Sequence, residues 1–199
     1  MLCPEQLATK KYLADVDYRK TGAERQIADA LAAHFQTECR GPQYVPYFIL
    51  VGANSSTGDA LGPFVGWFLQ RRGFPGLYRG DLHRPVHATN LEEQYAAAMA
   101  ETLRGGRYPL FMAVDAAVGR AGRITVNEGP LQPGAGVGKQ LPEVGTVHVL
   151  GGTAAIPFGI WFASLDQTVG MAEIIANAIE LMWYDLFPES LSAVAAAAD

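Results

Sequence analysis

YFILV at Tyr47–Val51 is an uninterrupted run of apolar side chains, and LFMAV at Leu110–Val114 is a second one. A strand with one face in the core alternates apolar and polar residues, whereas a strand covered on both faces does not. Both runs therefore predict central strands of a sheet that helices cover on two sides. Such double coverage is typical of parallel sheets in α/β proteins.

Helical periodicity and shorter apolar segments surround these two strands. The clearest helix is about Thr168–Phe187, where four apolar side chains recur on one face: Met171, Ile175, Ile179 and Met182. Further helices are predicted over Ala23–Phe35, Pro63–Arg72 and Leu91–Leu103, and strands over Gly76–Arg79, Ile124–Asn127 and Val147–Leu150. Because strands alternate with helices, we expect one three-layer α/β/α domain with a mostly parallel, twisted sheet and right-handed crossovers.

The chain has no internal repeat and no linker long enough to separate two domains. We expect residues 1–41 to form an N-terminal helical segment packed on the domain. Residues 42–188 form the α/β domain itself, and the Ala-rich residues 189–199 form a frayed tail.

The composition favours an ordinary globular protein with a small acidic excess. The net charge is −5, with 49% hydrophobic and 18% charged residues, which disfavours a nucleic-acid partner. The first residues lack the layout of a signal peptide, and no apolar run approaches the roughly 20 residues of a membrane span. Cys3 and Cys39 have no metal-site or disulfide spacing. We therefore expect a cytoplasmic protein with reduced thiols.

Two acidic residues follow the two apolar strands. Asp59 lies in the turn-rich segment after the first strand, and Asp115 comes directly after the second. In open α/β sheets, ligands bind beyond the carboxyl ends of the strands, so both carboxylates should face one rim. Neighbouring carboxylates separate in pKa, so that one can act as a base while the other keeps its proton. Such a pair could activate a water molecule or bind a divalent metal.

Each of the two acids also has a structural interpretation. Asp59 could cap a helix or close an Asx-turn, since Asp fills both roles often. Asp115 could instead form an ion pair with Arg120, because buried charges are usually paired. The residue types leave both interpretations open.

Other polar and glycine residues are candidates for the same rim. Asn54 and Thr57 precede Asp59 and could orient a substrate carbonyl. The glycine-rich Pro133–Lys139 (PGAGVGK) has the wrong spacing for a nucleotide-binding loop, and we expect Gly134 and Gly136 to expose backbone N–H groups there instead. Ser55 and Ser56 lack a nucleophile-elbow motif and are interpreted as turn residues.

Two histidines could approach the two acids. His87 follows the Gly76–Arg79 strand and could reach the rim. His148 lies within a strand, where a hydrogen-bonded core histidine is more common than a metal ligand. The chain has no HExxH motif and no Cys/His cluster, which argues against a dedicated zinc site.

Three ordered segments together resemble the spore-protease family: Asn54–Pro63 (NSSTGDALGP), Val114–Arg120 (VDAAVGR) and Pro130–Gly138 (PLQPGAGVG). Within that family the chain is most similar to the short, YyaC-type branch of sporulation proteins, where Pro85–Glu93 (PVHATNLEE) also has a counterpart. The resemblance runs from about Val45 to the end of the last helix. The chain is much shorter than germination protease, and residues 1–41 have no matching motif.

The resemblance implies an atypical aspartic-type endopeptidase whose substrates are small acid-soluble spore proteins, with Asp59 and Asp115 as its catalytic acids. It also implies a fold shared with hydrogenase-maturation peptidases, which bind a metal through acids and a histidine. In that case Asp59, Asp115 and either His87 or His148 would be the ligands; otherwise no cofactor is expected.

Three functions are therefore open. The first is an endopeptidase acting in sporulation or germination, which uses the two aspartates to activate water. The alternatives are a metal-binding maturation-type peptidase and a non-catalytic sporulation factor that binds a peptide or small ligand in the same pocket. The helix Pro63–Arg72, with Trp67 and Phe68, could serve a homo-oligomer interface or the core.

Overall fold

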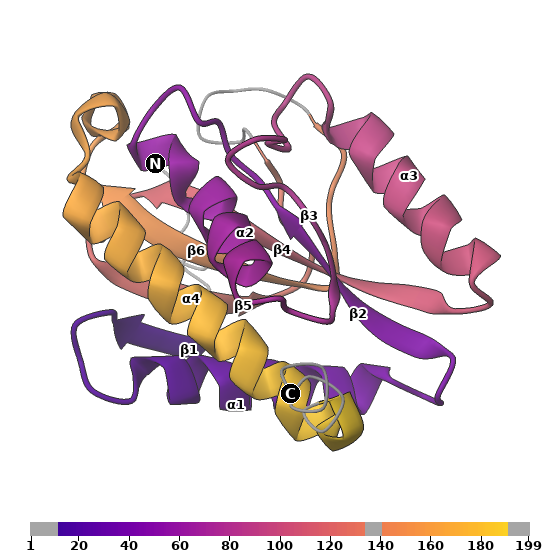
Figure 1. Ribbon diagram of the computed structural model, residues 1–199. Helices are drawn as coiled ribbons and strands as arrows, with labels where there is room; N and C mark the ends of the chain where they lie inside the picture. The colour runs from indigo at the N-terminus through magenta and orange to yellow at the C-terminus, as the bar shows by residue number, and fades with distance from the viewer. Residues whose placement is uncertain (1–11, 134–140, 191–199) are drawn as a thin grey trace, which may run out of the picture.

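The computed structural model describes residues 12–133 and 141–190, which form one α/β domain (Figure 1). The described sheet has six strands in the order β1-β5-β6-β4-β2-β3. The strands are β1 (Tyr12–Asp17), β2 (Tyr44–Leu50), β3 (Leu77–Arg79), β4 (Tyr108–Val118), β5 (Arg123–Glu128) and β6 (Val147–Ala154). The two apolar runs form β2 and β4, which are central neighbours, as the sequence predicts.

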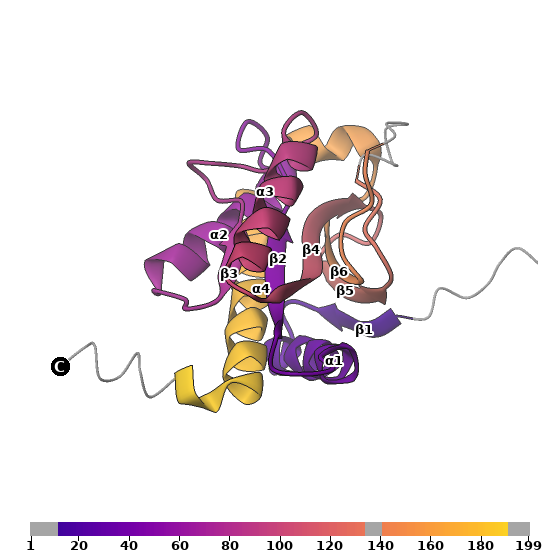
Figure 2. The same cartoon turned by 90° about the vertical axis from the view of Figure 1, so that its right-hand side faces the viewer.

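Helices cover both faces of the sheet, which confirms the three-layer α/β/α prediction. The α1 (Ala23–Glu38), α2 (Leu61–Arg71) and α4 (Leu165–Leu186) helices lie on one face, and α3 (Leu91–Arg104) lies on the other. Figure 2 shows α2 and α4 together on one side of the sheet. Each predicted helix is present, with bounds that differ by a few residues.

Alternating side chains of the central strands supply two separate cores. Phe48 and Leu50 of β2 pack toward α1, α2 and α4, whereas Tyr47 and Ile49 pack toward α3. All four side chains are buried. The absence of polar alternation in the sequence of β2 therefore reflects a strand with a core on each face.

The sheet is mixed, because one of its described strands, β5, runs against the others. The β2–β3, β2–β4 and β4–β6 pairs are parallel, while β5 is antiparallel to both β6 and β1. Since β6 lies between β4 and β5, the turn that joins these two strands must cross β6. A Cβ at Gly152 of β6 would lie 2.1 Å from the Arg120 carbonyl oxygen, so this crossing requires glycine.

The N-terminal part of the domain contains a strand that the sequence interpretation missed. Residues 1–41 were expected to be helical, but β1 precedes α1 and pairs with β5 at the edge of the sheet. Its charged residues Asp15 and Asp17 hide the strand pattern, since edge strands tolerate charge. The tail expected to fray, residues 189–199, lies largely outside the described residues.

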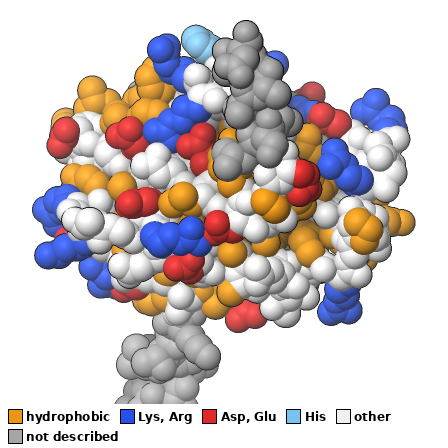
Figure 3. All heavy atoms as spheres, turned by 60° about the horizontal axis from the view of Figure 1, so that its bottom comes forward, with side chains coloured by type: hydrophobic (Ala, Val, Ile, Leu, Met, Phe, Trp, Pro, Cys, Tyr) orange, Lys and Arg blue, Asp and Glu red, His pale blue; other side chains and the backbone are white. Residues whose placement is uncertain are grey.

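Charges of both signs are interspersed over the face at the bottom of Figure 1, as Figure 3 shows. Arg25 of α1, for example, forms ion pairs with Asp29 on the same helix and with Asp185 on α4. Within the described ranges, no helix is long and apolar enough to cross a bilayer.

Candidate functional site

Asp115 lies inside β4 rather than directly after it, which corrects the expected position. The strand continues to Val118 because β6 pairs with it along this stretch, with Asp115 opposite Leu150. The side chain is partly buried, and its Oδ1 accepts a hydrogen bond of 2.8 Å from the Ala116 N–H. Strand pairing therefore fixes the backbone of this carboxyl group.

Asp59 lies in the short 3-10 helix η2 (Gly58–Ala60), between the end of β2 and the start of α2. Its backbone N–H donates to Ser56 O at 3.1 Å, and its carbonyl accepts from the Ala53 N–H at 3.1 Å. The residues at the starts of η2 and α2, Thr57 and Ala60, make no side-chain capping bond. The local backbone thus holds Asp59 without a helix-capping role for its carboxylate.

Burial raises the pKa of both acids, and other interactions add to the increase for Asp115 and oppose it for Asp59. It raises the pKa of Asp115 to about 8, with a further upward contribution from the charge of Asp59 and an opposing hydrogen bond from the Ala116 N–H. Burial also raises the pKa of Asp59, but the Ala53 N–H and the charge of His87 oppose that increase. At neutral pH Asp115 therefore carries a proton beside a more acidic Asp59, the arrangement of a general acid with a general base.

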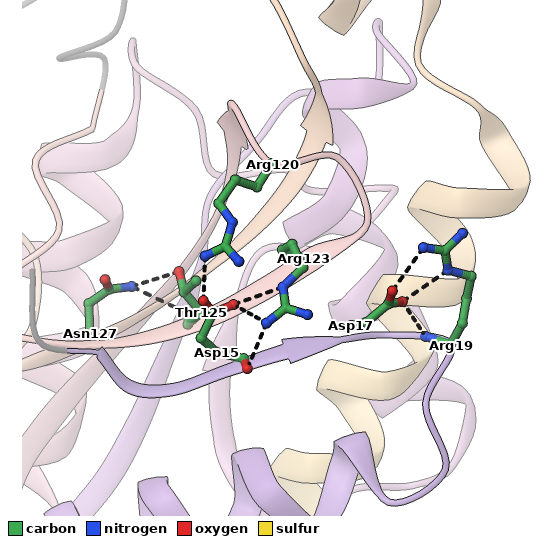
Figure 4. Close-up of polar contacts among 7 residues, drawn as sticks. All are labelled: Asp15, Asp17, Arg19, Arg120, Arg123, Thr125 and Asn127. Carbon is green, nitrogen blue, oxygen red and sulfur yellow. Dashed lines mark hydrogen bonds and ion pairs between the residues drawn. The ribbon is translucent and has the colours of Figure 1, made fainter.

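Arg120 does not form the ion pair with Asp115 that the sequence suggests. Arg120 pairs with Asp15 of β1, and Arg123 holds the same carboxylate at 2.7 Å (Figure 4). The two arginines thereby tie β1 to the β4–β5 turn and to β5. Since Arg120 is engaged with Asp15, the structural interpretation of Asp115 as its partner is wrong.

The supporting polar residues hold the loops around the two acids. The Asn54 Nδ2 donates to Leu82 O at 2.9 Å and connects the loop before Asp59 to the loop after β3. The backbone N–H of His87 donates to Asn90 Oδ1 at 2.8 Å, and Asn90 Nδ2 donates to Pro85 O. The Asn90 side chain thus stabilises the loop before α3 instead of capping that helix. His87 is partly buried and interacts electrostatically with Asp59.

The structure does not assemble the metal site that the family resemblance implies. His148 is buried in β6, and its Nδ1 lies 2.9 Å from Gly129 O, as expected of a core histidine. Within residues 12–133 and 141–190, no three His, Cys, Asp or Glu side chains are grouped closely enough to hold a metal ion. Asp59, Asp115 and a histidine therefore do not form a ligand set. The candidates Gly134 and Gly136 lie outside the described residues.

An exposed apolar segment next to Asp59 was missed from the sequence. The 3-10 helix η4 (Pro157–Phe162) contacts η2, and a Cβ at Gly58 would lie 2.5 Å from Ile160 O. Large apolar side chains of η4 and its flanks face solvent: Ile156, Phe158, Trp161, Phe162 and Leu165. The signal was present as IPFGIWF, an apolar stretch with glycine and proline at positions that interrupt a long helix.

Comparison with known proteins gives two matches. Residues 15–178 match the family described as "Protein of unknown function (DUF1256)". The chain is also 32% identical over 188 residues to "Uncharacterized protein YyaC" of Bacillus subtilis (strain 168), an alignment that covers 90% of this chain and 87% of that protein. The family match spans β2, β4 and both candidate acids.

Proposed function

We propose that this chain, which belongs to the DUF1256 family, is an endopeptidase acting in sporulation or germination, with Asp59 as its general base and Asp115 as its general acid. The observation that carries the proposal is the position of Asp115 in β4 next to η2, where burial and then the charge of Asp59 raise its pKa to about 8. Perturbed acids in one place are characteristic of catalytic sites. The resemblance of the Asn54–Pro63 and Val114–Arg120 segments to spore proteases supports peptides as the substrate.

The reaction requires no cofactor in this scheme. Asp59 accepts a proton from a water molecule, whose oxygen then attacks the carbonyl carbon of the scissile peptide bond. The protonated Asp115 donates a hydrogen bond to the carbonyl oxygen and stabilises its developing negative charge. The tetrahedral intermediate collapses as the C–N bond breaks, and the proton on Asp59 passes to the leaving amine. After this transfer Asp59 is ionised again and Asp115 still holds its proton, so both acids are back in their starting states.

The exposed apolar residues around η4 favour a polypeptide substrate over a small polar one. Phe158 is 79% exposed and Phe162 is 88% exposed, beside the short helix that carries Asp59. Exposed apolar clusters of this kind commonly mark binding surfaces. A flexible polypeptide could place its own apolar side chains there while its backbone passes the two acids.

The test is incubation of the purified protein with small acid-soluble spore proteins, followed by mass spectrometry over time. The wild type should release discrete fragments, and Asp59→Asn and Asp115→Asn should each reduce the rate by about a hundredfold or more. Asp29→Asn is the matched control, because Asp29 is exposed on α1 and pairs with Arg25. Fragments that appear equally fast with all three variants would contradict the assignment of the acids. If the wild type releases none, a non-catalytic binding factor becomes the better description.

A further inference from the structure

A polar cavity lies beside β3, at the edge of the sheet opposite to β1. It has a volume of about 280 Å³, and residues of β3 and α3 line it, among them Arg79, Gln94 and Glu101. Neither Asp59 nor Asp115 contributes to it. The cavity is therefore distinct from the candidate catalytic pair.

The cavity lies along β3, an edge strand of the sheet. Of the described strands, β3 pairs with β2 alone, so one row of its backbone N–H and C=O groups faces outward. Consecutive residues from Gly76 to Asp81 all line the cavity. An open strand edge is the backbone template that an extended peptide uses when it adds a strand to a sheet.

Arg79 has more N–H groups than the described residues around the cavity accept. Arg79 donates to three groups: Tyr47 Oη at 3.1 Å, Gln94 Oε1 at 3.1 Å and Glu101 Oε2 at 2.9 Å. A guanidinium carries five N–H groups, so two remain for a ligand once these bonds are counted within the described residues. The same Glu101 oxygen also accepts from the Tyr47 hydroxyl, which occupies the acceptor further.

Asp81 and Arg84 also line the cavity, and the Arg84 side chain likewise keeps N–H groups that the described residues do not accept. Asp81 Oδ1 accepts from the His83 and Arg84 N–H groups at 2.7 and 2.8 Å. The Arg84 side chain is 84% exposed, and its Nε forms an ion pair with Asp81 Oδ2 at 3.8 Å, a distance too long for a hydrogen bond. Both arginines thus keep N–H groups for which the described residues supply no acceptor, and a carboxylate could accept from them.

The size of the cavity and its neighbours favour one acidic side chain of a longer peptide. Small-molecule sites are usually about 300–1,000 Å³, so this cavity is at the low end for a whole cofactor. The loop after β3 is bonded to the loop before Asp59 through Asn54 and Leu82, so β3 leads toward the candidate acids. A peptide paired with β3 would therefore continue toward the site that we propose for cleavage.

We infer that the outer edge of β3 binds an extended polypeptide segment by strand addition and that Arg79 and Arg84 hold an acidic side chain of that segment. The inference rests on the proposed function in one respect, that the bound polypeptide is the substrate. It adds a preference for an acidic residue at a position away from the cleaved bond.

The experiment uses full-length Asp115→Asn protein, so that binding is measured without cleavage. The probe is an eight-residue peptide of alternating Val and Thr with a central Glu and with both ends blocked. A second peptide carries Gln in place of that Glu. Affinity is measured by fluorescence anisotropy, and the bound region by amide hydrogen exchange.

The Glu peptide should protect amides within residues 76–81 and should bind about tenfold more tightly than the Gln peptide. Arg84→Gln, at an exposed position that should not affect folding, should remove most of that difference. Arg107→Gln is the matched control, because it is an exposed arginine outside the cavity lining. Equal affinity for the two peptides, protection elsewhere, or no binding of either peptide overturns the inference. Cleavage by the wild type is scored separately, so failure of the proposed function would be recognised as a different result.

Discussion

Asp115 of β4 keeps its proton at neutral pH beside Asp59 of η2. Burial and, after it, the charge of Asp59 raise the pKa of Asp115 to about 8. The two residues are 56 positions apart in the chain, and the parallel pairing of β2 with β4 brings their segments together. Contacts between η2 and β4 complete this arrangement.

The stability of the protein should depend on the ionisation of Asp115. An unfolded aspartate ionises near pH 4, whereas the folded one keeps its proton to about pH 8. The folded state therefore binds the extra proton in that window, and the free energy of unfolding should fall as pH rises, by up to about 1.4 kcal/mol per pH unit. Asp115→Asn should remove this slope. Relative to the wild type, the free energy of unfolding of the variant should therefore be higher at pH 8.5 than at pH 4, by at least about 2 kcal/mol. Urea unfolding at the two pH values measures the effect, and an unchanged slope would refute it.

Removing the charge of Asp59 should lower the pKa of Asp115. Since burial is the larger cause, Asp59→Asn should return the pKa only part of the way toward the ordinary value of about 4. The carboxyl carbon chemical shift of Asp115, followed by NMR across pH 4–10, reports this directly. An identical titration in the wild type and in Asp59→Asn would mean that the two acids do not interact.

Arg120 should have no effect on the titration of Asp115. Its ion pair is with Asp15, which Arg123 also holds, so Arg120→Gln should leave the Asp115 titration unchanged. Hydrogen exchange in β1 should become faster, because the edge strand loses one of its ties to the rest of the sheet. A large upward shift in the pKa of Asp115 would contradict the pairing in Figure 4, because losing a cationic partner raises the pKa of a carboxyl group.

The contact between α2 and the end of β3 requires glycine. A Cβ at Gly66 would lie 1.8 Å from the Gly80 carbonyl oxygen, so Gly66→Ala should destabilise the fold by roughly 2–4 kcal/mol. Gly105→Ala is the control, since its nearest contact would be 3.3 Å from Thr102 O and should cost less than about 1 kcal/mol. Thermal and urea unfolding compare the two. Similar stability of both variants would show that α2 tolerates a wider separation from β3.

The apolar surface at η4 should affect substrate binding more than stability. Trp161 and Phe162 are 66% and 88% exposed, so the double change to serine should alter the free energy of unfolding by less than about 1 kcal/mol. If this surface holds a polypeptide, KM for a protein substrate should rise about tenfold or more with kcat little changed. An equal loss of kcat would instead indicate that η4 positions Asp59.

The layered core could be predicted from the spacing of apolar residues within single elements of the sequence. Met171, Ile175 and Ile179 follow helical periodicity and are all buried in α4. The strands β2 and β4 carry apolar side chains on both faces, which is the direct consequence of two cores. These patterns reflect the environment of each residue within its own element, so they need no knowledge of strand order.

Strand β1 could not be predicted from its own sequence. Its Asp15 is accommodated by Arg120 and Arg123, more than a hundred positions away, and a single segment carries no sign of that pairing. The antiparallel direction of β5 was also hidden, because it depends on how the turn after β4 crosses β6.

The candidate acids were identified from the sequence by their positions near the ends of apolar strands, and the family resemblance pointed to the same pair. The sequence alone thus determined the three layers and the two central strands, and it pointed to Asp59 and Asp115 as candidates, because side-chain periodicity and strand ends are local properties. The tertiary structure alone decided that Arg120 pairs with Asp15 instead of Asp115, which acid keeps its proton, and that no three-ligand metal group forms among the described residues. Those outcomes depend on burial and on distances between remote segments, and both arise when the sheet assembles.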